Sequence, residues 1–311
     1  MHPYILLLIA DTCVAAQFNL SKLYQRKYAH GMRDDLTFPM VSGLVTAPFF
    51  VLVGLLLNRA LPSVSAFSIG MAAAFAALNA ISLFTGILTL KRGGVTGYTV
   101  FMMLGGMILP YIYGLVFLEE QPSIVRIIGL AAVTAALLFF AMDGGKGEQK
   151  KTLKGYYPLC MAVFMLNGTS CVLSKIHAIH PQAIPASDYI LWMNLFQAGI
   201  AGTALLVYLR RHGKAKTPAA LPQCPPAADG AKRTWKGYLV IAIYAVDSGI
   251  GYLLQLIPAQ TVPASALYPF VTGGSILIST LMAAVWFKEK IGKWGIAGIA
   301  VAFIGTVLFM F

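Results

Sequence analysis

Charged side chains are scarce in this sequence. Lys, Arg, Asp and Glu together make up only 11% of the 311 residues, whereas they make up about 25% of an ordinary soluble domain. The hydrophobic content of 58% and the mean hydropathy of +0.76 agree with this. The composition excludes a soluble globular protein and predicts one that is embedded in a lipid bilayer.

Cysteine is also rare, and the usual catalytic motifs are absent. Four cysteines occur without CxxC or other metal-ligand spacing, so we expect neither a disulfide framework nor a metal site. The sequence has no Walker, HExxH or GxSxG motif, which would carry phosphate, zinc or acyl-transfer chemistry. We therefore expect no enzyme activity, no catalytic residues and no cofactor.

Long apolar runs fill most of the chain. Each run has roughly 20 residues, enough to cross ~30 Å of hydrocarbon as a helix. The fold class is therefore an all-α integral membrane protein with ten transmembrane helices. The predicted spans are 3–20, 37–57, 67–90, 95–118, 124–142, 156–174, 188–209, 237–258, 264–287 and 294–311.

The net charge of +12 has an uneven distribution that predicts the topology. With ten spans, 20 of the 23 Lys and Arg residues fall in loops on one side of the membrane. The other three are Arg59, Arg126 and Lys175. Because short cytoplasmic loops carry an excess of Lys and Arg, both termini are expected to be external. Topology thus explains the charge without a nucleic-acid partner.

Two similar stretches, "NLSKLY" and "VLSKIH", place Lys22 and Lys175 153 residues apart. Later in the chain, "GLVFLEEQPSIVRIIGL" parallels "AAVWFKEKIGKWGIAGI", at an offset of 169 residues. Such internal symmetry is typical of transporter folds. An odd number of spans in each copy requires the two copies to cross the membrane in opposite directions. The predicted units are a first repeat at 1–142, a linker at 143–155, and a second repeat at 156–311 with a basic loop at 210–236.

On these residues the chain resembles the drug/metabolite transporter superfamily, and most closely its EamA-type members with two five-helix repeats. The resemblance is carried by the lysine that ends the first helix of each repeat, the Gly-rich fourth helices, and the acidic turn before each fifth helix. It implies a ten-helix transporter that moves small organic solutes by alternating access through a central cavity between the halves.

Two carboxylates lie inside predicted spans, where an ionised side chain costs ~2.5–3.5 kcal/mol. Asp11 occurs in "LLIADTCVA" and Asp247 in "IYAVDSGIGY". Each could face a cavity and bind a cation or exchange protons, or it could instead hydrogen-bond neighbouring helices together. Small multidrug relatives within the resembled superfamily use a carboxylate in their first helix, which is analogous to Asp11.

Other polar and aromatic residues within spans are candidates for solute binding. Each has a structural alternative, either an interhelical hydrogen bond or a lipid-facing aromatic ring. Lys22 and Lys175 are expected either to snorkel to opposite membrane surfaces or to act as paired gate charges. Glu120 and Glu289 are expected to cap helices or to pair at the interface. The solute-binding candidates, besides the two carboxylates, are Asn79, Asn167, Asn194, Gln197, Tyr98, Phe101, Tyr268 and Phe270.

The sequence therefore predicts a secondary active transporter of a small organic solute in the plasma membrane, coupled to protons through Asp11, Asp247 or both. Its partners would be the solute and the lipid bilayer, and the oligomeric state stays open. The alternatives are a flippase component for lipid-linked intermediates, a membrane-embedded enzyme, and a receptor or assembly subunit. The carboxylates favour a cationic or zwitterionic solute, whereas Lys22 and Lys175 would favour an anion if they faced the cavity.

Overall fold

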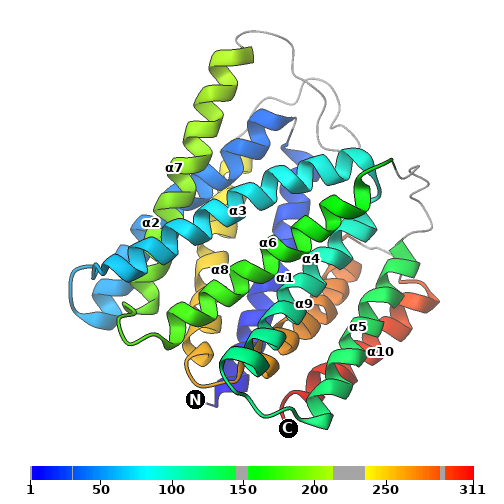
Figure 1. Cartoon of the computed structure of the whole chain (residues 1–311). Coiled ribbons are helices and arrows are strands. Elements are labelled where there is room, and N and C mark those ends of the chain that lie inside the picture. The colour runs from blue at the N-terminus through cyan, green and yellow to red at the C-terminus, as the bar shows by residue number, and fades with distance from the viewer. Residues whose placement is uncertain (1, 30, 145–152, 213–234, 288–290) are drawn as a thin grey trace.

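The computed structural model describes residues 2–29, 31–144, 153–212, 235–287 and 291–311. This part of the chain forms ten helices joined by turns and contains no strand (Figure 1). Most of the predicted linker and most of the basic loop lie outside the described residues. The helices are α1 (Pro3–Lys27), α2 (Met32–Asn58), α3 (Ala66–Arg92), α4 (Val95–Phe117), α5 (Ile124–Gly144), α6 (Tyr156–Ile179), α7 (Ala186–His212), α8 (Trp235–Ala259), α9 (Ala264–Phe287) and α10 (Lys293–Leu308).

The all-helical fold class is confirmed, and each predicted span corresponds to one helix. Nine helices of the described chain are long and apolar enough to cross a membrane. The tenth, α10, is a shorter apolar helix of 16 residues, which at about 1.5 Å per residue reaches less far than ~30 Å of hydrocarbon. α1 continues past the predicted end of its span to Lys27, and its last turn carries Arg26 and Lys27.

The helices pack in pairs that relate the two halves of the chain. α1 packs on α8 and α9, and α6 packs on α3 and α4 in the same way. α2 lies against α7 and α5 against α10, while α2 also meets α8 and α3 meets α7. Exchanging each helix with the one five positions along the chain leaves this set of pairs unchanged. Figure 1 shows both termini at the same end of the bundle, with α1 starting there.

Glycines allow the closest of these crossings. A Cβ atom on Gly168 of α6 would lie 2.6 Å from the carbonyl oxygen of Gly105 on α4, and one on Gly105 would overlap the backbone of Phe164. Only a residue without a side chain lets the two helix backbones approach this closely. The α4–α6 crossing therefore depends on glycine at both positions.

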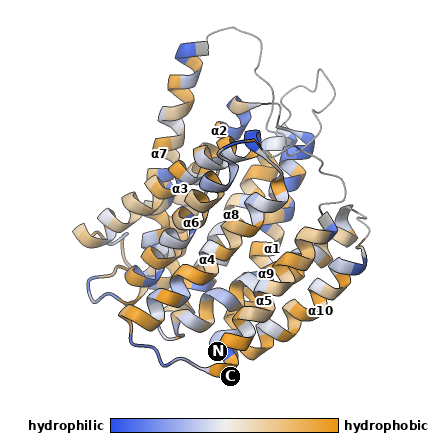
Figure 2. Ribbon diagram, turned by 45° about the vertical axis from the view of Figure 1, so that its right-hand side comes forward, coloured by the Kyte–Doolittle hydropathy of each residue, from blue (hydrophilic) through white to orange (hydrophobic). Residues whose placement is uncertain are grey.

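The outer face of the bundle is apolar. Large exposed side chains include Leu56, Phe117 and Ile124, each about 70% exposed or more. Figure 2 shows hydrophobic colour along the outward sides of the helices and strongly hydrophilic residues at the end away from the two termini. We call this the basic end, because it carries the Lys and Arg residues in the last turns of α1 and α3. The outer face is suited to lipid contact, as expected of a multi-pass membrane protein.

Candidate functional site

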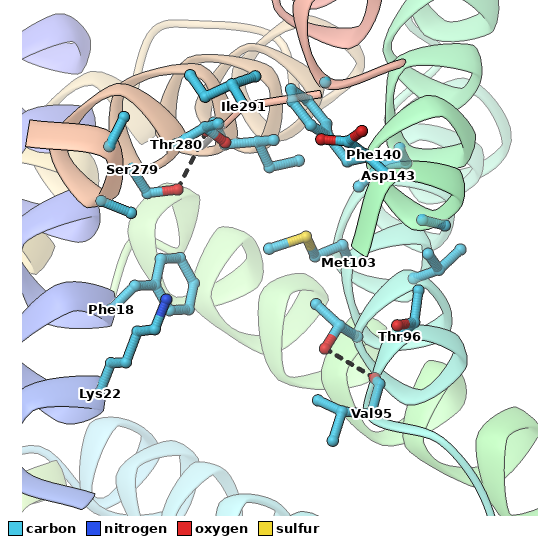
Figure 3. Close-up of a pocket in the computed structure, with 18 of the residues that line it drawn as sticks. Phe18, Lys22, Val95, Thr96, Met103, Phe140, Asp143, Ser279, Thr280 and Ile291 are labelled. Carbon is cyan, nitrogen blue, oxygen red and sulfur yellow. Dashed lines mark hydrogen bonds between the residues drawn. The ribbon is translucent and has the colours of Figure 1, made fainter. Parts of the chain in front are cut away.

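Two cavities lie in the half of the bundle nearer the basic end, one on either side of α1. The first has a volume of about 520 Å³ and lies between α1, α4, α5, α9 and α10 (Figure 3). The resemblance implies a central cavity between the halves, and each of these two cavities is lined by helices from both halves of the chain. α6, which packs against α3 and α4, lines neither of them. The first cavity is lined by Phe18, Asn19, Lys22, Val95, Thr96, Thr99, Val100, Met103, Leu137, Phe140, Ala141, Asp143, Ile276, Ser279, Thr280, Ala283, Ala284, Ile291 and Gly295.

Two opposite charges lie on facing walls of the first cavity. Figure 3 shows Lys22 of α1 on one side and Asp143 of α5 on the other. Asp143 Oδ2 accepts a hydrogen bond of 2.9 Å from the backbone N–H of Gly292, the residue that precedes α10. A carboxylate in this position satisfies an unpaired N–H at the helix start and interacts favourably with the helix dipole. Asp143 therefore also holds α5 against α10.

The first cavity lies nearer the basic end than Asp11, along the same face of α1. Asn19 donates hydrogen bonds to Ala15 O at 2.8 Å and to Ser279 O of α9 at 3.4 Å. Asp11 lies on the same face of α1 as Asn19, two turns farther from the basic end, because positions four and eight residues apart align along a helix. The Asp11 side chain is 0% exposed and packs against Gly274 of α9, where a Cβ atom would overlap the carboxylate.

Neither oxygen of Asp11 has a hydrogen-bond partner among the described residues. An ionised carboxylate in such a place costs several kcal/mol unless it is paired. The contact between α1 and α9 therefore encloses the titratable carboxyl group of Asp11 and extends to the first cavity.

The second cavity has a volume of about 280 Å³ and lies between α1, α2, α3, α7 and α8. The predicted amides Asn79 and Gln197 line it, and Asn79 also donates a 2.9 Å hydrogen bond to Phe75 O of its own helix. Its acidic side chain is Asp35 of α2. The complete lining is Ser21, Tyr24, Gln25, Asp35, Leu36, Phe38, Pro39, Ser42, Ala76, Asn79, Ala80, Leu83, Phe84, Gln197, Ile200, Ala201, Ala204 and Tyr244.

Asp247 lies one turn deeper on α8 than Tyr244, and the two side chains interact electrostatically. Asp247 is half-buried beside Cys13 of α1, and its Oδ2 has no hydrogen-bond partner in the described part of the chain. Residues 11 and 13 are separated by about 200° around a helix. Asp11 and Asp247 therefore lie on different sides of α1, each beyond one of the two cavities.

The other residues predicted to bind solute lie outside the linings of these two cavities. Asn167 of α6 donates a 2.7 Å hydrogen bond to Met102 O of α4, and Asn194 donates one of 2.9 Å to Ile190 O of its own helix. Tyr268 donates a 2.6 Å hydrogen bond to Cys171 O. The remaining members of the set are Tyr98, which packs against Gly86 of α3, Phe101, which is partly buried on α4, and Phe270, which is buried on α9.

At the end of the bundle that carries the termini, two side chains fasten the α8–α9 turn by hydrogen bonds. Lys175 of α6 is 3% exposed and donates hydrogen bonds to Ala259 O at 2.6 Å and to Val262 O at 2.8 Å. Glu120, which follows α4, accepts hydrogen bonds from the N–H groups of Ala264 at 2.6 Å and Ser265 at 2.9 Å. The predicted capping role of Glu120 is confirmed, whereas Glu289 lies outside the described residues.

Sequence reasoning missed Asp35 and Asp143, the two carboxylates that line the cavities. Both lie at the ends of apolar runs, where a charged residue is expected to reach water. The aromatic residues Tyr24, Phe38 and Tyr244, which line the second cavity beside Asp35, also carry no distinctive motif. The available signal was the Asp34–Asp35 pair immediately before the second apolar run.

Comparison with known proteins gives a limited likeness. No family model matches the chain. It is 28% identical over 81 residues to the Multidrug resistance protein EbrA of Bacillus licheniformis, which covers 26% of this chain and 73% of that protein. A solved structure titled "Crystal structure of protein" aligns over 98% of both chains, with a TM-score of 0.73 and 12% identity. The fold is therefore one already seen in a solved structure. The likeness to EbrA and the many membrane-spanning helices together support a membrane transporter in general terms.

Proposed function

We propose that this protein is an EamA-type secondary active transporter, which moves a small organic solute across the plasma membrane by alternating access. The observation that carries the proposal is the difference between the two ends of the bundle. One end contains two cavities that approach Asp11 and Asp247, while hydrogen bonds fasten the α8–α9 turn at the other end. A transporter whose structure is open toward one side of the membrane is expected to have such a difference between its two ends.

The packing of the helices supports two equivalent halves, at 1–142 and 156–311. In an inverted duplication, every contact between helices has a counterpart in which the two halves exchange roles. The main helix pairs follow this rule, whereas the weaker pairs α5–α9, α6–α8 and α7–α8 have no counterpart of comparable extent. The loop charges then orient the halves: the basic end, with both cavities, faces the cytoplasm, and the two termini are external.

Asp11 and Asp247 would couple solute movement to protons. Asp11 is enclosed between α1 and α9 with no hydrogen-bond partner among the described residues, so it cannot readily lose its proton while these helices stay together. Rocking of the two halves would separate α1 from α9 and expose the carboxyl group to water. Asp247, beyond the second cavity, would titrate as α1 moves away from α8.

The test is proton-linked flux in liposomes that contain the purified protein and a trapped pH-sensitive dye. The solutes offered are the standard amino acids, simple amines and ethidium. A transported solute should acidify or alkalinise the lumen with the wild-type protein, and this should be lost in the Asp11→Asn/Asp247→Asn double variant. Glu119→Gln, at an exposed turn, is the matched control and should keep coupling. Unchanged coupling in the double variant would refute the role of these carboxylates.

A further inference from the structure

We propose that the second cavity is a binding site for amphipathic organic cations, which enter it sideways from the lipid between α3 and α7. The cation would be the solute, or one of the solutes, of the proposed transporter. The binding step rests on the geometry of the cavity alone. It can therefore be measured without any transport.

The lining of the second cavity has the charge for a cation. Asp35 supplies a carboxylate, and no Lys or Arg is present among the described residues that line it. Amide groups of Asn79 and Gln197 lie on other walls of the same cavity. A cationic group can thus reach a carboxylate while amides replace part of its water shell.

Aromatic rings beside Asp35 strengthen this preference. Tyr24 of α1, Phe38 of α2 and Tyr244 of α8 form a row, with ring centroids 4.9 Å apart for the first pair and 4.7 Å apart for the second. All three residues line the cavity. The faces of Phe and Tyr rings attract cations, and the attraction grows where water is excluded. Three rings and one carboxylate favour a soft organic cation over a small hydrated metal ion.

An apolar groove adjoins this cavity on the lipid-facing side of the bundle. The groove has a volume of about 710 Å³ and lies between α2, α3 and α7. Phe196, Gly199 and Val207 of α7 contribute to its wall, and a Cβ atom on Gly199 would meet nothing within 4 Å. Groove and cavity share four lining residues, which are Leu36, Phe84, Ile200 and Ala204.

These four shared side chains are the only described residues that line both spaces. The apolar part of the cation, which partitions into the bilayer, would lie in the groove, and its charged group would lie in the cavity. Arg211, at the basic end of the groove, is placed to contact lipid phosphate groups. The acyl chain of a phospholipid is the competing occupant of the groove, but its anionic head would not suit Asp35.

The first test compares two ions of equal shape and opposite charge, tetraphenylphosphonium and tetraphenylborate, by equilibrium dialysis against the protein in lipid nanodiscs. Saturable binding of the cation and not of the anion is expected. Asp35→Asn should weaken cation binding about tenfold or more, since it removes the charge at close range. Tyr244→Leu is a second variant that removes one ring and should also weaken binding. Glu119→Gln, remote from the cavity, should bind as the wild type does.

The second test concerns the route. Ala204→Phe enlarges a shared side chain and should slow association and dissociation of tetraphenylphosphonium in stopped-flow measurements, with little change in affinity. Unchanged rates would overturn entry from the lipid. The proposed site would be overturned if both ions bind equally, or if the Asp35→Asn variant binds the cation as tightly as the wild type does. It would also be overturned if a phospholipid stays in the groove and the cation cannot displace it. Binding without proton-linked flux would refute the proposed transport and leave the site intact.

Discussion

The Lys175 ammonium group lies 2.6 Å from the carbonyl oxygen of Ala259 and 2.8 Å from that of Val262, so one buried side chain from α6 holds the turn between α8 and α9. The last carbonyl groups of a helix lack partners within it, and a cation there also interacts favourably with the helix dipole. At the start of α9, the carboxylate of Glu120 accepts hydrogen bonds from two N–H groups that also lack partners within the helix. Opposite charges thus satisfy the two helix ends that meet at this turn.

Lys175→Met should destabilise the protein. The substitution keeps an apolar stem of similar length but leaves the carbonyl oxygens of Ala259 and Val262 without this donor, a loss of about 1–3 kcal/mol. Unfolding by sodium dodecyl sulfate, followed by tryptophan fluorescence in mixed micelles, measures the difference. Lys22→Met is the matched control, since Lys22 is partly exposed and lines a cavity. A larger loss for Lys22→Met than for Lys175→Met would contradict this role.

Glu120→Gln should cost about 1 kcal/mol, because the amide keeps one acceptor oxygen but loses the charge at the start of α9. The neighbouring substitution Glu119→Gln provides the comparison, since Glu119 is exposed. Thermal melting in detergent should lower the midpoint for Glu120→Gln only. If both variants melt at the wild-type temperature, the two hydrogen bonds to Ala264 and Ser265 contribute little to stability.

The spans could be predicted from the sequence because the bilayer imposes one requirement on every crossing segment: an apolar run long enough to satisfy its own backbone as a helix. The helix ends were less predictable. α1 continues beyond its apolar run through Lys22 to Lys27, because this part still packs in the bundle, beside the cavities that Lys22 and Tyr24 line. Hydropathy alone marks where the apolar run ends and gives no sign of this extension.

The candidate site was only partly predictable, for a related reason. Asp11 and Asp247 are conspicuous as charges within apolar runs, and the structure places each beyond a cavity. Asp35 sits in the first turn of α2 and resembles an ordinary helix-start acid. Its place in a cavity depends on which helices pack around it, and periodicity in α2 does not contain that information. For the same reason, the sequence could not indicate that Asn167 hydrogen-bonds to α4 and lies outside the linings of these two cavities.

Gly105→Ala should disrupt the α4–α6 crossing. The new methyl group would overlap the backbone of Phe164, and a backbone cannot swing aside as a flexible side chain can, so we expect a cost of about 1–3 kcal/mol. Gly70→Ala is the matched control because a Cβ atom there meets nothing within 4 Å. Alanine in an open helix interior should instead stabilise by about 0.5–1 kcal/mol. Denaturation midpoints that shift in the same direction for both variants would contradict the close approach.

The proposed orientation can be tested with the protein's own cysteines. Cys224 lies in the predicted basic loop, outside the described residues, and positive-inside topology places that loop in the cytoplasm. Cys160 is buried, while Cys13 and Cys171 are only partly exposed within helices. A membrane-impermeant maleimide should therefore leave intact cells unlabelled and label the protein after permeabilisation. Cys224→Ser should abolish that labelling, which assigns it to the loop. Strong labelling of the wild type in intact cells would reverse the topology, and both cavities at the basic end would then face outward.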